Sequence, residues 1–244
     1  MFMKRMGFDR TKPLVAITNA SDTVKNRDAE RVVKALQKQV DEHFAPAWGF
    51  PAELLFNEQP LLAMKIMIKD RAADEDAGFL GYHFVDGLPV TVIFAKDDIS
   101  DRGEYSSTLS HELLEMISDP GVDLYSLGYY RDKAGRRKKA FIPYEVCDPV
   151  EAHTYKIDGV VVSNFVLPEW FEPEHKDGAM QMDYVGVLDS PFQLAPGGYI
   201  DTFWNGKTKT IWGEKTRHKK VRHRLTGRQN HIDADIAGAR RRRK

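Results

Sequence analysis

The sequence predicts an α+β protein, and three features of its 244 residues lead to that fold class. Short β-rich apolar runs surround one stretch of helical periodicity before residue 100, which is typical of a mixed sheet with helices. A second helical segment follows at residues 107–118, and beyond it only short strands and loops are expected. The end of the chain is strongly basic. We therefore expect one folded body over residues 8–213 and a basic, extended C-terminal tail over residues 214–244.

The elements of the first half follow from apolar periodicity and turn signals. Residues 13–19 form a buried strand, and helical spacing then continues to about Phe44, where Pro46 should end the helix. Ser21 or Asp22 is expected to cap that helix. The other strands predicted in this half are residues 52–56, 63–68, 79–84 and 89–95, the last two joined by an Asp86-Gly87 turn.

A central helix separates the two halves of the body. It spans residues 107–118 and ends at Pro120-Gly121, and residues 96–107 before it should be a polar connection. Residues 131–139 form a basic, hairpin-like excursion. The strands predicted after it are residues 140–146, 153–157, 160–165, 199–204 and 208–212, with tight turns at Asp158-Gly159 and Asn205-Gly206.

Composition limits the classes of function. Hydrophobic residues make up 42% and charged residues 30% of the chain, which is typical of a globular protein. No apolar run approaches the roughly 20 residues of a membrane helix, and the start of the chain shows no signal peptide. We therefore expect a cytoplasmic or virion-associated protein without a membrane partner. The single cysteine, Cys147, excludes an internal disulfide and any zinc site built from several thiolates.

The net charge of zero conceals two unlike parts. Residues 215–244 hold twelve Lys or Arg and two Asp, a net charge of +10, so the rest of the chain carries −10. Such a segment attracts nucleic acid or an acidic protein partner, although without aromatic residues it should not select a base sequence. A solubilising tail is the alternative. The predicted polyanion-binding residues are Lys219, Lys220, Arg222, Arg224, Arg240, Arg241, Arg242 and Arg243.

The helix at residues 107–118 contains the one pattern that indicates chemistry. Its spacing, His-Glu-x-x-Glu, places His111 and Glu115 one turn apart on the polar face, where both can bind one metal ion. Glu112 would reach a metal-bound water and act as general base, as in His-Glu-x-x-His zinc helices. The carboxylate in place of the second histidine extends the metals from zinc to Mn²⁺ or Ca²⁺. A solvated polar face is the alternative interpretation.

Further metal ligands are expected from the acidic segment at residues 144–151. We favour Glu145 and Asp148. One of them would bind the metal and the other would support that ligand without binding the metal, and either residue could take either role. Cys147 would be a strong zinc ligand only if it pointed inward. Asp119 lies about 12 Å from His111 along the helix axis, so it should support the site, cap the helix or bind a different ion. His83, in the predicted strand 79–84, is interpreted as a core or strand-edge histidine.

Two blocks carry a resemblance to a known family. The segments LSHELLEMISDP at residues 109–120 and YEVCDPVE at residues 144–151 resemble bacterial and phage-encoded proteins that are similar to zincin-type (His-Glu-x-x-Glu) metallopeptidases. A more distant likeness is to plant phosphate-induced (exordium-type) proteins. The resemblance covers most of residues 13–204. It implies a zincin-like domain, with a mixed sheet packed on an active-site helix, and a site completed by the Glu145/Asp148 pair.

Two functions follow from these observations. The first is a metal-dependent hydrolase, a zinc metallopeptidase-like protein that acts on a peptide or protein with Glu112 as general base. The alternative is a non-catalytic, metal-stabilised structural component, for example of a phage virion, whose tail docks on nucleic acid or an acidic partner. The absent second histidine weakens the first hypothesis. Glu112 weakens the second, because a structural ion does not need a general base.

Overall fold

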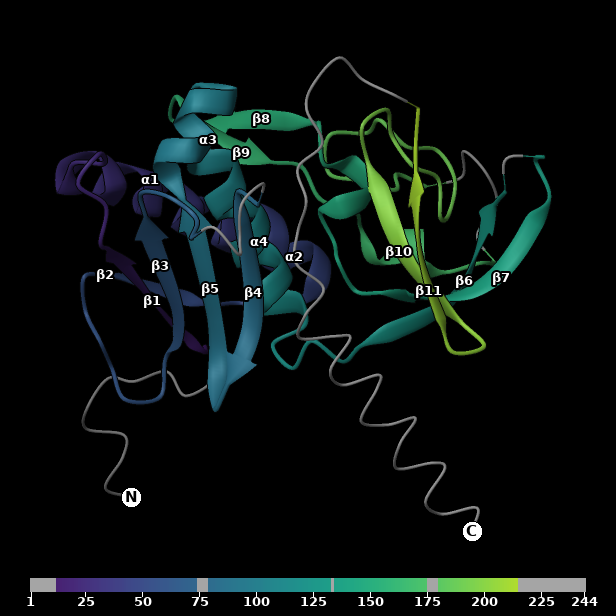
Figure 1. Cartoon of the computed structure of the whole chain (residues 1–244), viewed down its shortest axis with the longest axis horizontal. Coiled ribbons are helices and arrows are strands. Elements are labelled where there is room, and N and C mark those ends of the chain that lie inside the picture. The colour runs from purple at the N-terminus through teal and green to yellow at the C-terminus, as the bar shows by residue number, and fades with distance from the viewer. Residues whose placement is uncertain (1–11, 74–78, 133, 175–179, 215–244) are drawn as a thin grey trace, which may run out of the picture.

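The described residues of the computed structural model, 12–73, 79–132, 134–174 and 180–214, form a mixed α+β fold (Figure 1). They contain a five-stranded sheet, a four-stranded sheet, a two-stranded ribbon and few helices. The α+β class predicted from the sequence is therefore confirmed. The predicted tail, including all eight of its predicted polyanion-binding residues, lies outside the described residues except for Glu214.

The five-stranded sheet has the order β2-β1-β3-β5-β4, and only its edge strand β4 runs antiparallel to its neighbour. Gly87, with φ of +68°, makes the tight turn between β4 and β5 that the Asp86-Gly87 pair predicts. All five strands were predicted to within two residues. Their bounds are Leu14–Asn19 (β1), Glu53–Phe56 (β2), Met64–Lys69 (β3), Gly81–Asp86 (β4) and Leu88–Phe94 (β5).

The first helix extends further than predicted. Helix α1, Asn26–Lys38, continues through a π-helical segment, Gln39–Phe44, into α2, Ala45–Trp48. The prediction that Pro46 ends the helix is wrong, because Pro46 lies in the first turn of α2, where a missing N–H is tolerated.

The expected cap of α1 is also wrong. The residue at the N-cap position is Lys25, and it makes no side-chain cap. The Ser21 hydroxyl instead accepts hydrogen bonds from the backbone N–H of Thr23 and Val24 and donates one to Asp70. Ser21 therefore orders the loop before α1 rather than the first turn of the helix.

Helix α4, Ser106–Ser118, lies between the five-stranded sheet and the rest of the molecule (Figure 1). It packs on β4 and β5 from one side and on β9 (Val160–Ser163) from another. Every residue of α4 is consequently buried, including those of its polar face. The alternative of a solvated polar face is therefore wrong. A short helix, α3 (Ala95–Arg102), replaces the polar connection that we predicted before α4.

The second half of the described chain is rich in strands and loops. Its four-stranded antiparallel sheet has the order β11-β10-β7-β6, and the predicted basic excursion is the tip of the β6–β7 hairpin. A Cβ atom on Gly198 would lie 2.0 Å from the carbonyl oxygen of Pro149, so this glycine lets the start of β10 contact η4. The bounds are Tyr125–Arg131 (β6), Arg137–Pro143 (β7), Asp148–Val150 (3-10 helix η4), Thr154–Ile157 (β8), Val160–Ser163 (β9), Pro168–Phe171 (3-10 helix η5), Tyr199–Trp204 (β10) and Lys207–Trp212 (β11).

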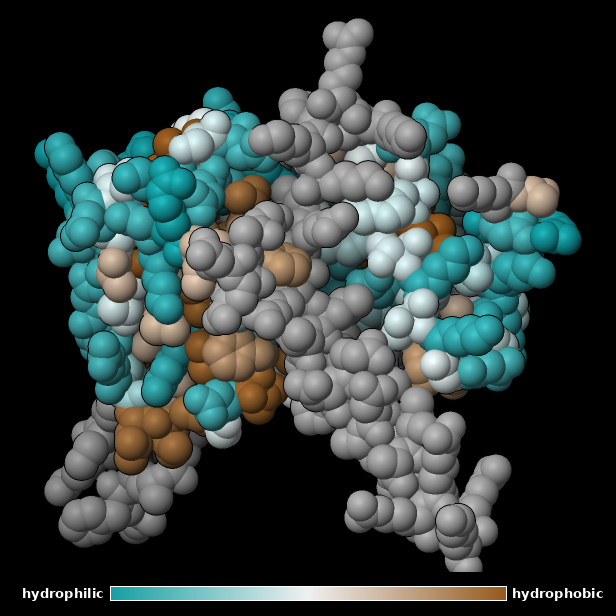
Figure 2. Space-filling view, viewed as in Figure 1, coloured by the Kyte–Doolittle hydropathy of each residue, from teal (hydrophilic) through white to brown (hydrophobic). Residues whose placement is uncertain are grey.

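One hydrophobic core joins both halves. It extends from the strands of the first sheet through α4 to Trp170 and Ile200 in the second half. The face seen in Figure 2 is mostly hydrophilic, with apolar side chains gathered along the lower edge of the half that contains the five-stranded sheet. Among the described residues, no helix has the length and apolar character that crossing a membrane requires.

Candidate metal centre

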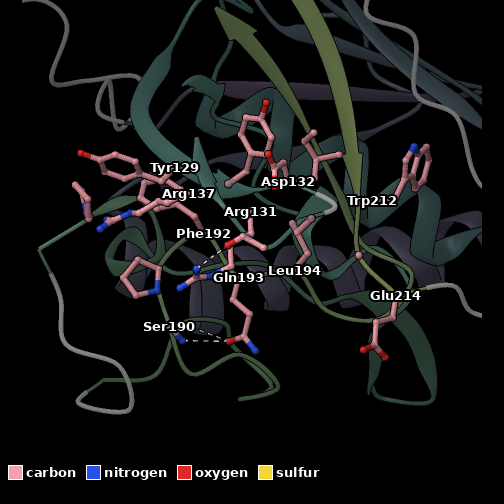
Figure 3. A pocket seen from close by; sticks show the side chains of 16 residues that line it. Tyr129, Arg131, Asp132, Arg137, Ser190, Phe192, Gln193, Leu194, Trp212 and Glu214 are labelled. Atoms are coloured by element: carbon pink, nitrogen blue, oxygen red, sulfur yellow. Dashed lines mark hydrogen bonds between the residues drawn. The ribbon is translucent and has the colours of Figure 1, made fainter. Parts of the chain in front are cut away.

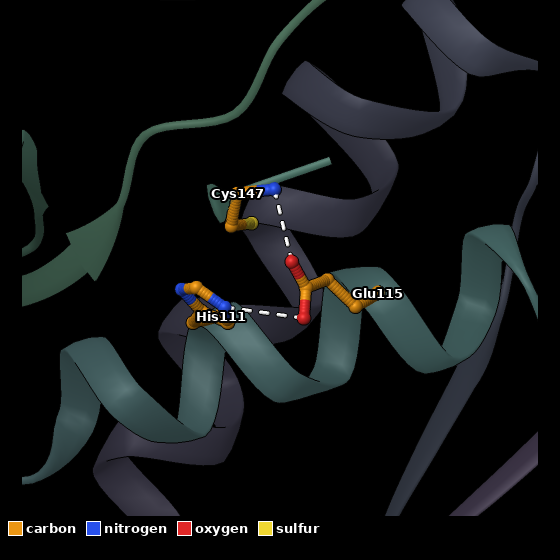
Figure 4. A group of neighbouring side chains, drawn as sticks. All are labelled: His111, Glu115 and Cys147. Atoms are coloured by element: carbon orange, nitrogen blue, oxygen red, sulfur yellow. Dashed lines mark hydrogen bonds and ion pairs between the residues drawn. The ribbon is translucent and has the colours of Figure 1, made fainter. Parts of the chain in front are cut away.

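Helix α4 presents three of the predicted site residues in one buried place. His111, Glu112 and Glu115 are 3%, 0% and 1% exposed. The imidazole Nε2 of His111 lies 3.1 Å from Oε2 of Glu115, as expected for side chains one helical turn apart (Figure 4). The helix therefore brings His111 and Glu115 together in the way that the His-Glu-x-x-Glu spacing predicts.

The segment between β7 and β8 brings Asp148 to this pair. Its Oδ1 lies 3.2 Å from Nε2 of His111, on the same ring nitrogen that faces Glu115. The backbone N–H of Cys147 donates a hydrogen bond of 3.2 Å to Oε1 of Glu115 (Figure 4). The Cys147 side chain is buried and, with His111 and Glu115, forms one of three groups whose ligand atoms lie within 4.8 Å of one another.

Glu145, the other predicted partner, lies beside a different histidine. Its Oε2 is 3.7 Å from Nε2 of His83, and these two residues form the second of the three groups with Glu115. His83 is buried in the edge strand, as expected, but it also faces carboxylates, which the sequence analysis did not predict. Its Nδ1 lies 3.0 Å from Oε2 of Glu112.

A glycine allows this close approach between β4 and α4. A Cβ atom on Gly81 would lie 3.1 Å from both Cγ and Oε1 of Glu112. Gly81 and His83 share one face of β4, because side chains two residues apart in a strand point the same way. A glycine and a histidine at this spacing were the available sequence signal for a strand that packs on the helix.

Glu151 is a further residue that the predicted set of ligands omitted. Its Oε2 lies 3.0 Å from Nδ1 of His111, and its Oε1 accepts a hydrogen bond of 2.6 Å from Arg102 in α3. His111, Asp148 and Glu151 form the third group of ligand atoms. Asp119 belongs to none of these three groups. Its carboxylate accepts hydrogen bonds from the backbone N–H of Asp123 and of Leu124, and these bonds hold the loop after α4.

Burial and charge strongly perturb this centre. Burial disfavours a charged imidazole, but the carboxylates of Glu145 and Glu112 outweigh it and raise the pKa of His83 to about 9. Burial also lowers the pKa of His111, but the charges of Glu115 and Glu151 outweigh it and raise that pKa well above its usual value. Such a concentration of negative charge favours a positive group between the side chains.

Tyr199 brings the second sheet to the centre. It lies at the start of β10, is 4% exposed, and contributes a phenol that no sequence pattern singled out. Burial first, and then the charges of Asp148 and Glu151, raise its pKa well above the usual value. The buried, negatively charged surroundings of Tyr199 therefore favour its protonated form.

The donor atoms suit a divalent metal ion. Ligands that bind a tetrahedral ion at about 2.0–2.2 Å are separated by roughly 3.4 Å. The three contacts made by the Nε2 atoms of the two histidines, at 3.1, 3.2 and 3.7 Å, are close to that separation. Nitrogen and carboxylate donors fit zinc or Mn²⁺, while two imidazoles make the site less suited to Ca²⁺.

A separate cavity of about 1000 Å³ lies at the four-stranded sheet (Figure 3). Its walls include Tyr129, Arg137, Phe192 and Trp212, and Arg137 lies 3.8 Å over the ring of Tyr129. None of the residues that line it belongs to the three groups of metal-binding geometry. The cavity is therefore distinct from the candidate metal centre.

Comparisons of the chain with protein-family models, curated proteins and solved structures found no match.

Proposed function

We propose that the chain is a metal-dependent hydrolase with a zincin-like domain, similar to zinc metallopeptidases, that acts on a peptide or protein. The observation that supports this proposal is the separation of roles along α4. His111 and Glu115 both belong to groups with metal-binding geometry, whereas Glu112, next to His111 in sequence, belongs to none of those found among the described residues. In the proposed hydrolase, Glu112 would lie beside the bound ion and would be available as the general base.

Glu112 has the surroundings of a proton acceptor. Its carboxylate is fully buried, and Nδ1 of His83 lies 3.0 Å from Oε2 and orients it. A bound divalent ion would supply Lewis-acid activation of the scissile carbonyl and of water. Glu112 would take the proton of the attacking water and deliver it to the leaving amine.

The burial of the centre favours a second candidate function, in which the metal ion is structural and joins the two halves of the body. The most exposed members of the three groups are Glu145 and His83, at 9% and 8%. In the hydrolase, the substrate would reach the centre from the side of these two residues. In the structural alternative, the ion would exchange slowly and no substrate would enter.

The test begins with the metal content of the purified chain, measured by elemental mass spectrometry. We expect bound zinc or manganese in the wild type and in Glu112→Gln, and loss of metal in Glu115→Ala and His111→Ala. The metal-loaded wild type should then cleave members of a fluorogenic peptide library, and Glu112→Gln should be at least about 100-fold slower. Circular dichroism of each variant establishes that it is folded.

Three results would contradict the hydrolase. A wild type that binds no zinc, manganese or calcium would remove the metal centre altogether. Cleavage by Glu112→Gln at the wild-type rate would exclude Glu112 as the base. A metal-loaded wild type that cleaves no peptide and retains its ion in the presence of excess chelator would establish the structural alternative instead.

A further inference from the structure

The two histidines of the centre have the same arrangement of neighbours. In His111, Nδ1 faces Glu151 at 3.0 Å, while Nε2 faces Glu115 and Asp148. In His83, Nδ1 faces Glu112 at 3.0 Å, while Nε2 faces Glu145, and the residue forms a group with Glu115 and Glu145. Each ring therefore has one carboxylate at Nδ1 and at least one more at Nε2.

This arrangement is typical of histidines that bind metal ions. A ligating histidine usually donates its other ring N–H to a carboxylate, which fixes the tautomer and leaves the second nitrogen free of hydrogen. Glu151 and Glu112 are placed to accept from Nδ1 of the two rings. The carboxylates near each Nε2 atom would then face a lone pair, which is favourable only with a cation between them.

Counting charges leads to the same conclusion. Five carboxylates that are at most 9% exposed face the two rings, and Arg102 pairs with one of them, Glu151. With the carboxylates ionised, Arg102 and two charged imidazoles would still leave this set of side chains with a net charge of −2. Two divalent ions, Arg102 and two neutral imidazoles would balance the five carboxylates, which are Glu112, Glu115, Glu145, Asp148 and Glu151.

We propose that the centre binds two divalent metal ions, one at His111 and one at His83 with Glu145, bridged by the carboxylate of Glu115. Among the residues that the structure describes, Glu115 alone belongs both to a group with His111 and to the group with His83. The inference rests on the proposed function in that it uses the same centre. It adds a second ion, whose ligands come from β4 and from the segment after β7.

The test is a count of metal ions in the full-length chain. The metal-free protein is loaded with Mn²⁺, excess ion is removed, and manganese is measured against protein for the wild type and variants. We expect two ions in the wild type, one in His83→Ala and in Glu145→Gln, and none held stably in Glu115→Ala. His153→Ala is the matched control, because His153 lies near the same segment but in none of the three groups, and it should retain two ions.

Magnetic coupling provides a second measurement, which reports whether two bound ions share a ligand rather than how many ions are bound. Two Mn²⁺ ions that share a carboxylate are exchange-coupled, so the loaded wild type should give a much weaker electron paramagnetic resonance signal per ion than His83→Ala. Histidines in residues 215–244 can bind manganese, but ions bound there would be uncoupled.

The outcomes separate this inference from the proposed function. One ion per wild-type chain, retained in His83→Ala and lost in His111→Ala, would overturn the two-ion centre and leave the hydrolase proposal in place. Two ions without coupling, or two ions that persist in His83→Ala and Glu145→Gln, would overturn it as well. Absence of any bound ion would overturn both proposals.

Discussion

Asp98 illustrates how far burial alone can change one side chain. It lies in α3 and is fully buried, and its Oδ1 is 3.9 Å from Nε of Arg102. Burial raises the pKa of Asp98 to about 7, although the hydroxyl of Thr108 and the charge of Arg102 act in the opposite direction. In the folded protein this carboxyl group is therefore partly protonated at neutral pH. In an unfolded chain its pKa would be near 4, and the group would be ionised at neutral pH.

We expect this difference to make the protein less stable as the pH rises from about 4 to 7. In that interval the folded chain binds more protons at Asp98 than the unfolded chain, so the free energy of unfolding falls, by on the order of 4 kcal/mol. Asp98→Asn should remove this part of the pH dependence. Urea unfolding at pH 5 and pH 8 measures it, with Asp101→Asn, an exposed change in the same helix, as control. An unchanged pH dependence in Asp98→Asn would contradict the prediction.

At the same scale, the sequence indicates some residues of the centre and not others. His111, Glu112 and Glu115 are neighbours on one helix, so their local spacing was enough to predict that they lie together. His83 contacts Glu112 across 29 residues, and Arg102 contacts Glu151 across 49. Such pairs are created by tertiary packing, and no local pattern contains them.

At the scale of elements, the contact between β4 and α4 depends on Gly81. A side chain there would be within 3.1 Å of Glu112 and of Cγ2 of Thr108, and both belong to a helix that is buried on all sides. We expect Gly81→Ala to lower the free energy of unfolding by about 1–3 kcal/mol through overpacking. Val85→Ala, at an exposed position of the same strand, should cost only about 0.5 kcal/mol.

Equilibrium urea unfolding of both variants checks this expectation. Gly81→Ala should also weaken metal binding, because the added methyl group displaces Glu112 and the strand that carries His83. Equal stability of Gly81→Ala and the wild type would show that β4 moves freely relative to α4.

Elements with strong local signals were predicted well. The Asp86-Gly87 and Asn205-Gly206 turns lie where expected, because their left-handed backbone requires such residues. Helix α3 was missed, since its polar sequence resembles a loop and its end at Gly103 is its main signal. The π-helical segment before Pro46 was also missed. It places Gln39 against α4, where the hydroxyl of Ser110 donates a 2.7 Å hydrogen bond to its Oε1.

At the scale of the whole molecule, the centre joins the two halves of the chain. His83 and α4 belong to the first half, while the segment from Glu145 to Glu151 belongs to the second. An ion that binds only the folded chain stabilises it in proportion to the logarithm of its concentration over Kd. We expect chelation with EDTA to lower the Tm, by about 4 °C or more.

Differential scanning calorimetry measures this change. Re-addition of Mn²⁺ or Zn²⁺ should restore the Tm of the wild type, whereas Glu115→Ala should show the lower Tm with and without metal. A Tm that is unaffected in wild-type protein from which EDTA has removed the metal, as measured by elemental mass spectrometry, would mean that no ion contributes to the stability of the fold.

The opposite charges of the body and the tail predict a second property of the whole molecule. Residues 215–244 carry +10 and the rest of the chain −10, so binding of a polyanion should depend on the tail alone. We expect the full chain to bind duplex DNA with an affinity that falls steeply with salt, and a chain ending at Glu214 not to bind.

Each phosphate contact contributes about 0.9 to the slope of log affinity against log salt. Replacement of Arg240, Arg241, Arg242 and Arg243 by alanine should therefore reduce that slope by as much as about 3.6, without a preference for any base sequence. Fluorescence anisotropy with two unrelated duplexes between 50 and 200 mM salt measures both quantities. Equal binding by the chain that ends at Glu214, or an affinity independent of salt, would show that the tail has another role.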